Sequence, residues 1–256
     1  MGDPVVLIHP WPMSSRVWEA QVPALVGAGH RVIAYDRRGF GSSSQPWDAY
    51  DYDTLTADLR ALLEHLDVRA ATLVGYSMGG GEVARYIATY GTDRVARAVL
   101  VATALPYRYR TADNPEGDAD DALVAQLLDG VRKDRLAFLE GFVQGWFGAG
   151  PGADVVSDAQ RRYLLQIAAF ASPKGTLNCL ASIARTDFRA DLEHVTVPTL
   201  LIHGDADAGV PLELTARRSH AAIAGSELVV IEGGAHGLVL THAEEVNRAL
   251  LDFLGR

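Results

Sequence analysis

A Gly-x-Ser-x-Gly pentapeptide at residues 75–79 follows an apolar run, Ala71–Val74, and precedes a helical pattern that starts near Gly80. Between a strand and a helix this pattern is typical of a nucleophile elbow, because its glycines let the chain turn so sharply that the serine hydroxyl projects from the sheet edge. The same turn points the backbone N–H of Met78 toward the hydroxyl of Ser77. The pattern therefore predicts an α/β fold with Ser77 as a nucleophile; the alternative is a Gly-rich turn with a helix-capping serine.

Short apolar runs alternate with helical patterns along most of the chain. Several runs lack polar alternation, which is typical of strands covered on both faces. Alternating strands and helices indicate a doubly wound, mostly parallel sheet. The expected strands are Val5–His9, Arg31–Tyr35, Ala71–Gly75, Ala98–Ala102, Thr199–His203 and Leu228–Ile231. The expected helices are Trp18–Ala28, Thr54–Leu66, Gly80–Thr89, Leu212–Ile223 and Ala243–Leu254.

The alternation stops between about Leu105 and Ala190, where no convincing strand is found. After a Pro/Asp/Gly loop, helical patterns cover Ala122–Val131, Arg135–Trp146, Ser157–Phe170 and Lys174–Arg185. We therefore expect a core of residues 1–104 and 191–256 with an inserted helical cap, residues 105–190. Most aromatic side chains of this cap are expected to pack on the core, and the others to face a substrate pocket below.

Composition and charge narrow the class of protein. Hydrophobic residues make up 48% of the 256 positions, enough for a full core, and the net charge of −9 without a basic cluster argues against a nucleic-acid partner. The single cysteine excludes an intrachain disulfide, and no Cys/His spacing fits a metal or haem site, so we expect no cofactor. No signal peptide or membrane span is recognisable, which favours a cytoplasmic protein; secretion after signal removal is the alternative.

A serine nucleophile needs a base, and the base needs an acid to orient it, in the chain order serine, acid, histidine for this fold. Both Asp205 and Asp207 follow a predicted strand. We choose Asp207, because Asp205 is nearer the strand and better placed to cap its own loop. His236 stands among glycines between a strand and a helix, whereas its competitor His242 lies near the start of the last helix. The predicted catalytic residues are thus Ser77, Asp207 and His236.

The loop His9-Pro10-Trp11-Pro12 follows the first predicted strand and is expected to supply the second oxyanion donor. Because proline has no N–H, Trp11 alone can donate from the backbone between positions 10 and 12. The alternative is a simple rigid turn. We expect His9 and His203, which end strands, to form hydrogen bonds with neighbouring loops.

Seven segments carry a family resemblance: His9–Pro12, Tyr35–Ser43, Asp51–Thr54, Gly75–Tyr86, Thr186–Arg189, His203–Asp207 and Ala235–Gly237. In these segments the chain resembles one branch of the α/β-hydrolase family: the cofactor-free haloperoxidases or perhydrolases, with the similar aryl esterases and γ-lactamases. Members usually carry glycine where Pro10 stands. The hairpin that normally precedes the first strand is absent here, which indicates either a truncated start or a homo-oligomer or larger assembly.

The resemblance implies that Ser77 is the nucleophile, His236 the base and Asp207 its orienter, with the Trp11 and Met78 N–H groups as the oxyanion hole. It implies cleavage of small esters through an acyl-enzyme without metal, haem or flavin. Hydrogen peroxide in place of water would give a peracid, which oxidises halide. The residues expected to line the pocket are Pro12, Phe142, Trp146, Val210 and Leu238.

Two other functions stay open on the sequence. The same triad could open a cyclic amide such as a γ-lactam, or the chain could be a ligand-binding module that kept a hydrolase shell. A dehalogenase or epoxide hydrolase is not expected, because Ser77 occupies the elbow where an aspartate would be needed. Pro12, directly after the oxyanion residue, favours the use of peroxide, because it reorients a neighbouring carbonyl that could accept a hydrogen bond from it.

Overall fold

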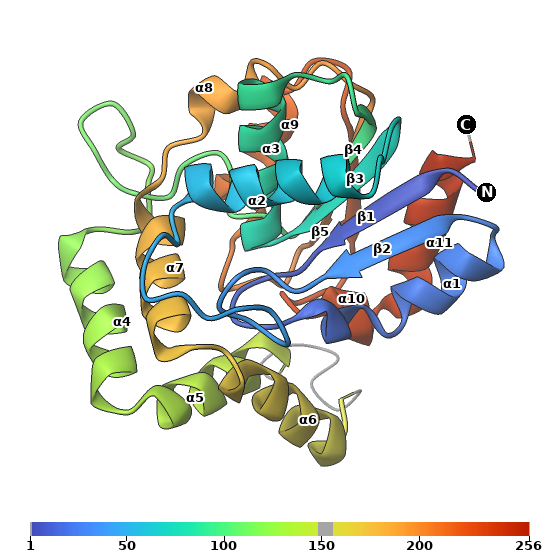
Figure 1. Ribbon diagram of the computed structural model, residues 1–256. Coiled ribbons are helices and arrows are strands. Elements are labelled where there is room, and N and C mark those ends of the chain that lie inside the picture. Colours follow the sequence, from blue (N-terminus) through green and yellow to red (C-terminus); the bar gives the residue numbers. More distant parts are fainter. Residues whose placement is uncertain (1, 148–155, 256) are drawn as a thin grey trace.

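Six parallel strands form the centre of the protein, in the order β2-β1-β3-β4-β5-β6 (Figure 1). The structure is a computed structural model that describes residues 2–147 and 156–255, with the backbone alone at position 147. The strands are β1 (Pro4–Ile8), β2 (Arg31–Tyr35), β3 (Ala71–Tyr76), β4 (Val95–Val101), β5 (Thr199–Gly204) and β6 (Glu227–Ile231). All six predicted strands are confirmed, and the largest difference is at β4, which begins at Val95 instead of Ala98.

The central strands are covered on both faces, as their apolar sequences require. Every residue of β3 and β5 is buried. Helices α1 (Gln21–Gly27) and α11 (Ala243–Leu254) pack together on one face of the sheet, and α2 (Tyr52–His65) and α3 (Met78–Tyr90) on the other (Figure 1). Strand order changes direction beside β1, so the carboxyl ends of β1 and β3 form the crevice where α/β sheets bind ligands.

Four long helices lie between β4 and β5 within the described part of the chain. They are α4 (Asp121–Lys133), α5 (Arg135–Phe147), α6 (Asp158–Ala169) and α7 (Pro173–Arg185). They lie together at the end of the molecule toward which β1 and β2 point (Figure 1). The short α8 (Arg189–Leu192) follows α7 before the chain re-enters the sheet.

Two predicted helices differ from the structure. The expected helix Leu212–Ile223 is divided into a 3₁₀ turn, Leu212–Leu214, and α9 (Ala216–Ala222), because Thr215 between them leaves helical geometry. The expected helix Trp18–Ala28 begins at Gln21, and Trp18 ends a separate 3₁₀ turn. The last short helix before α11 is α10 (Leu238–Thr241). In residues 2–147 and 156–255, no helix has both the length and the apolar character needed to cross a membrane.

Candidate active site

The turn between β3 and α3 holds Ser77 in a backbone conformation that side chains rarely adopt. Its φ is 52° and its ψ −113°, and at such a positive φ a residue other than glycine is strained. The flanking glycines are required: a Cβ on Gly75 would lie 2.4 Å from the carbonyl oxygen of Gly79, and one on Gly79 would lie 2.5 Å from that of Ile8. The sharp turn projects the serine hydroxyl at the sheet edge, as the sequence predicted.

His236 and Asp207 meet Ser77 at this edge. The Nε2 atom of His236 is 3.0 Å from Oγ of Ser77, and its Nδ1 atom is 2.5 Å from Oδ2 of Asp207. All three residues are nearly buried, with 8%, 4% and 4% of their surface exposed for Ser77, Asp207 and His236. An ionised Asp207 accepts a hydrogen bond from Nδ1–H, so Nε2 carries no proton and can accept the hydrogen bond of the Ser77 hydroxyl.

The surroundings of Asp207 keep it ionised. Burial alone would raise the pKa of this carboxyl, but the His236 ring and its hydrogen bond bring the pKa below its ordinary value. The Val210 N–H donates to the other carboxylate oxygen at 2.8 Å. His203 also lies beside the carboxylate and forms the expected loop hydrogen bond, with its Nε2 atom 2.8 Å from the Val210 carbonyl oxygen.

The two competing residues have other partners. Asp205 accepts a hydrogen bond from the Gly233 N–H at 2.7 Å, so it joins two loops at the carboxyl ends of β5 and β6. This differs from the expectation that Asp205 would cap its own loop. His242 lies beside Thr241, with its Nδ1 atom 2.9 Å from the threonine Oγ1 atom.

Two backbone N–H groups are available to stabilise an oxyanion. Among the described residues, the N–H groups of Trp11 and Met78 donate to no acceptor, and each belongs to a loop or helix start beside Ser77. The carbonyl oxygen of the Pro10–Trp11 peptide points the opposite way and accepts the Met13 N–H at 3.1 Å. Because a trans peptide is planar, fixing this carbonyl also fixes the direction of the Trp11 N–H. The following Trp11–Pro12 bond is cis.

The same carbonyl is held by His9, a contribution that the sequence did not assign. The Nδ1 atom of His9 is 2.9 Å from the Pro10 oxygen, and the backbone N–H of Arg37 donates to Nε2 at 3.0 Å. These two contacts define a neutral ring with its proton on Nδ1. Burial, followed by the nearby Arg37 guanidinium, lowers the pKa of His9 to about 3, which keeps the ring neutral.

Arg37 joins the two segments that carry the expected oxyanion donors. Its Nη2 atom donates to the His9 carbonyl at 2.7 Å, and its Nε atom donates to Oε1 of Glu82 at 2.7 Å. His9 immediately precedes the Pro10–Trp11 peptide, and Glu82 lies on α3, whose first residue is Met78. All three side chains of this network are buried. The sequence signal for this network was Arg37 itself, which lies in Tyr35–Ser43, one of the segments that carry the family resemblance.

Aromatic side chains from α5 cover the base and the oxyanion loop. The rings of Trp146 and His236 have centroids 4.7 Å apart, and the Phe142 ring lies 4.7 Å from that of Trp11. The Trp146 carbonyl accepts the Gly237 N–H at 3.1 Å, which ties α5 to the residue after the base. Tyr76 donates its hydroxyl proton to the His236 carbonyl at 2.5 Å. The covering helix therefore fixes the base as well as enclosing it.

Of the other expected pocket residues, Pro12 follows the Trp11 donor and Val210 binds Asp207 through its backbone N–H. The Leu238 side chain is fully buried at the start of α10. Their contact with substrate stays a prediction.

No alternative nucleophile or metal centre is evident in the described residues. The thiol of Cys179 is buried, and burial raises its pKa to about 12, so it is not a thiolate near neutral pH. Within residues 2–147 and 156–255, no group of three or more His, Cys, Asp or Glu side chains is placed to hold a metal ion.

Known proteins share this architecture over nearly the whole chain. Residues 3–243 match the model of the α/β hydrolase fold family. A putative non-heme chloroperoxidase of Synechocystis sp. is 47% identical over 254 residues, covering 99% of this chain and 91% of that protein. A bifunctional esterase/perhydrolase of Acinetobacter calcoaceticus is 37% identical, covering 98% and 91%. The crystal structure of a bromoperoxidase from Bacillus anthracis superposes with a TM-score of 0.97 at 57% identity, covering 100% and 93%.

Proposed function

The chain belongs to the α/β hydrolase fold family, and on that premise we propose that it is a serine hydrolase that cleaves small carboxylic esters through an acyl-enzyme and also uses hydrogen peroxide. The observation that carries the proposal is the hydrogen-bonded series from Ser77 through His236 to Asp207, with two free N–H groups beside it. A relative that is an esterase/perhydrolase supports both halves of the activity.

In the first half-reaction, Ser77 Oγ attacks the ester carbonyl carbon while His236 Nε2 takes the hydroxyl proton. The carbonyl oxygen becomes negative, and the N–H groups of Trp11 and Met78 stabilise it. The intermediate collapses when the bond to the leaving alkoxide breaks and His236 returns the proton to that oxygen. Asp207 keeps the ring oriented and stabilises its charged form throughout. The product of this half is an alcohol and an acylated Ser77.

In the second half-reaction, water or hydrogen peroxide attacks the acyl carbon, and His236 takes the proton of the attacking oxygen. The same N–H groups stabilise the second oxyanion. The bond to Ser77 Oγ then breaks, and His236 gives the proton to the serine. Water yields a carboxylic acid and peroxide yields a peracid, which oxidises halide after release. The ratio of the two products depends on how well each nucleophile is held near the acyl group.

Intact-protein mass spectrometry after treatment with a fluorophosphonate tests the nucleophile. We expect one adduct, located on the peptide containing Ser77, and none in the Ser77→Ala variant. Hydrolysis of p-nitrophenyl esters should fall with the same time course as labelling. An unlabelled wild-type protein, or a labelled variant, would overturn the proposed mechanism.

A Pro12→Leu substitution tests the use of peroxide. The proline follows the proposed oxyanion donor directly, where it sets the direction of a carbonyl that could accept a hydrogen bond from peroxide. We expect the ratio of perhydrolysis to ester hydrolysis to fall, measured with one p-nitrophenyl ester with and without hydrogen peroxide. An unchanged ratio would remove Pro12 from this role. Including lactams in the same panel shows whether amides are substrates as well.

A further inference from the structure

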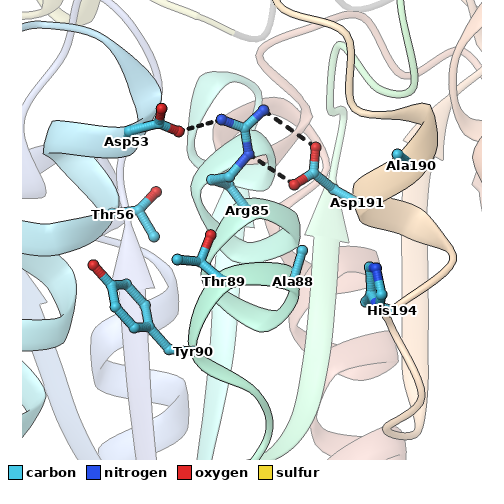
Figure 2. Close-up of a pocket in the computed structure, with 9 residues that line it drawn as sticks. All are labelled: Asp53, Thr56, Arg85, Ala88, Thr89, Tyr90, Ala190, Asp191 and His194. Atoms are coloured by element: carbon cyan, nitrogen blue, oxygen red, sulfur yellow. Dashed lines mark hydrogen bonds and ion pairs between the residues drawn. The ribbon is translucent and has the colours of Figure 1, made fainter.

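Among the surface hollows that the described residues form away from the catalytic residues, two have a volume above about 500 Å³, and they differ in how their charged groups are paired. The first, of about 550 Å³, lies between α2, α3 and α8 (Figure 2). Arg85 at its centre donates to both oxygens of Asp191, at 2.7 and 3.2 Å, and also pairs with Asp53. Both aspartates of this hollow pair with its single arginine, so Arg85 is not free to bind an anion.

The second hollow, here called the Trp47 groove, has a volume of about 610 Å³. It lies between the loop that carries Trp47, the junction of α4 and α5, and the first turn of α7. Its lining residues are Gln45, Pro46, Trp47, Val131, Arg132, Arg135, Ser172, Pro173, Lys174 and Leu177. Three of them carry positive charge and none is an aspartate or glutamate. The volume is within the range of small-molecule sites.

Within residues 2–147 and 156–255, Arg135 has no counter-ion, unlike the arginine in Figure 2. Its Nη2 atom donates to the Ala169 carbonyl at 3.2 Å, while its Nη1 atom is enclosed and has no acceptor among the described residues. The neighbouring Asp134 accepts the Ala137 N–H instead. Burial lowers the pKa of Arg135, and no carboxylate opposes that shift. A half-buried guanidinium with an unused N–H is a group that an anion would satisfy.

A second cation faces the same groove without a carboxylate partner. The Lys174 ammonium lies 4.5 Å from the centre of the Trp47 ring and forms no ion pair with any described residue. It stands in the first turn of α7, where the helix dipole adds positive potential. Arg132, in contrast, pairs with Asp129 at 2.8 Å. Two uncompensated cations thus converge in a protein whose net charge is −9.

We propose that the Trp47 groove binds a monocarboxylate with a flat apolar body, of which benzoate is the simplest probe. The carboxylate would lie between Arg135 and Lys174, after a small rotation of the guanidinium toward the groove, and form charge-assisted hydrogen bonds. The apolar body would cover the Trp47 ring, which is 75% exposed, between Pro46 and Leu177. Nothing in this assignment requires Ser77 to be reactive.

Calorimetric titration with benzoate, beside the neutral benzamide, tests the charge requirement. We expect benzoate to saturate the wild-type protein below about 10 mM, the range for so small a ligand. Benzamide, Arg135→Gln and Lys174→Gln should each weaken binding about tenfold, since each removes one charge-assisted contact. Lys133→Gln, an exposed cation next to the groove on α4, should change the affinity less than twofold. Raising the salt concentration should weaken benzoate binding as well.

Fluorescence locates the ligand. Trp47 is exposed, whereas the other tryptophans, Trp11, Trp18 and Trp146, are buried, so acrylamide should quench Trp47 selectively. Bound benzoate should protect this residue, and Trp47→Phe should abolish the protected fraction. Equal affinity for benzamide and benzoate, or unchanged benzoate binding in a folded Arg135→Gln/Lys174→Gln double variant, would overturn the assignment. Binding that persists in that double variant but is lost after fluorophosphonate labelling would place benzoate at Ser77 instead.

Discussion

At the residue scale, two carboxylates of one loop, Asp205 and Asp207, differ in their hydrogen-bond partners. Asp207 is buried and contacts the ring of His236, while Asp205 is more exposed and binds a backbone N–H of the next loop. The order of serine, acid and histidine, each after a strand, predicted that this loop meets Ser77 and His236, but the order alone did not distinguish Asp207 from Asp205. The hydrogen bond between Asp205 and the Gly233 N–H was not predictable, because it depends on how two loops from different strands approach each other.

Replacing each aspartate by asparagine should separate these roles. Asp207→Asn leaves the shape but favours the wrong His236 tautomer, so we expect kcat for ester hydrolysis to fall about 10⁴-fold. Asp205→Asn keeps an oxygen that can accept the Gly233 N–H, and its loss should stay below about tenfold. Steady-state kinetics and melting curves of both variants provide the measurement. Comparable losses in the two folded variants would contradict the assignment of Asp207.

The contacts of His9 could be predicted only in part from the sequence. A histidine at a strand end was expected to form a hydrogen bond with a neighbouring loop, and His9 does so. The sequence did not predict that Arg37, which is distant in the chain, contacts both the ring and the backbone carbonyl of His9. A buried network of this kind has no local pattern, because its members come from different strands and a helix. We infer that His9 is a positioning residue, acting through the Pro10–Trp11 peptide on the proposed oxyanion donor.

Substitutions of His9 test this positioning role. His9→Ala removes the donor to the Pro10 carbonyl and frees the peptide to rotate, so we expect kcat to fall about 10- to 100-fold with little change in KM. His9→Asn places an amide N–H near the position of Nδ1 and should recover most of kcat. If His9 had only a structural role, both variants would lose stability and activity together. Equal kcat values for the alanine and asparagine variants, at equal folded fraction, would refute the positioning role.

At the scale of elements, the sharp turn into α3 depends on close backbone contact. The packing of α3 on β1 leaves no room for a side chain at Gly79, because the nearest atom is the Ile8 carbonyl oxygen. Alternating apolar runs were enough to predict the sheet and most helices. They did not predict the break at Thr215, whose hydroxyl donates to the Pro211 carbonyl at 2.7 Å and competes with helical geometry.

A matched pair of glycine substitutions tests this packing. Gly79→Ala would place a Cβ 2.5 Å from a backbone oxygen that cannot move without disturbing β1, so we expect a loss of at least about 3 kcal/mol in the free energy of unfolding. Gly141→Ala lies in helix α5 with open space around it and should stabilise the protein by about 0.5–1 kcal/mol. Urea denaturation compares the two. A neutral Gly79→Ala would show that α3 can shift away from β1.

At the scale of the whole molecule, the parallel sheet brings together side chains that are far apart in the chain. The carboxyl ends of parallel strands meet at one edge, so residues 9, 77, 207 and 236 converge there. This convergence could be predicted because each of these residues stands at or just after the end of a strand expected to lie in a parallel sheet. The convergence also buries several ionisable groups at one end of the protein, and that makes the stability of the fold depend on pH.

Because of His9, the protein should begin to lose stability at a pH well above the range in which carboxyl groups titrate. The native pKa of His9 is about 3, whereas a histidine in an unfolded chain titrates near 6.5. Between these values the unfolded state binds one more proton, so the free energy of unfolding falls as pH falls, by about 1.4 kcal/mol per pH unit. His203, whose pKa burial also lowers, acts in the same direction. Asp207 adds its contribution only below about pH 3.9, because its native pKa is lowered.

Urea denaturation of wild-type protein and His9→Asn at pH 6.5, 5.5 and 4.5 measures this contribution. The variant starts less stable but has no group that titrates at position 9. Its stability should therefore fall less steeply, by about 1.4 kcal/mol per pH unit, than that of the wild type. Parallel slopes for wild type and His9→Asn would mean that the buried ring takes up its proton at Nε2 in the native state, where it could no longer accept the Arg37 backbone N–H.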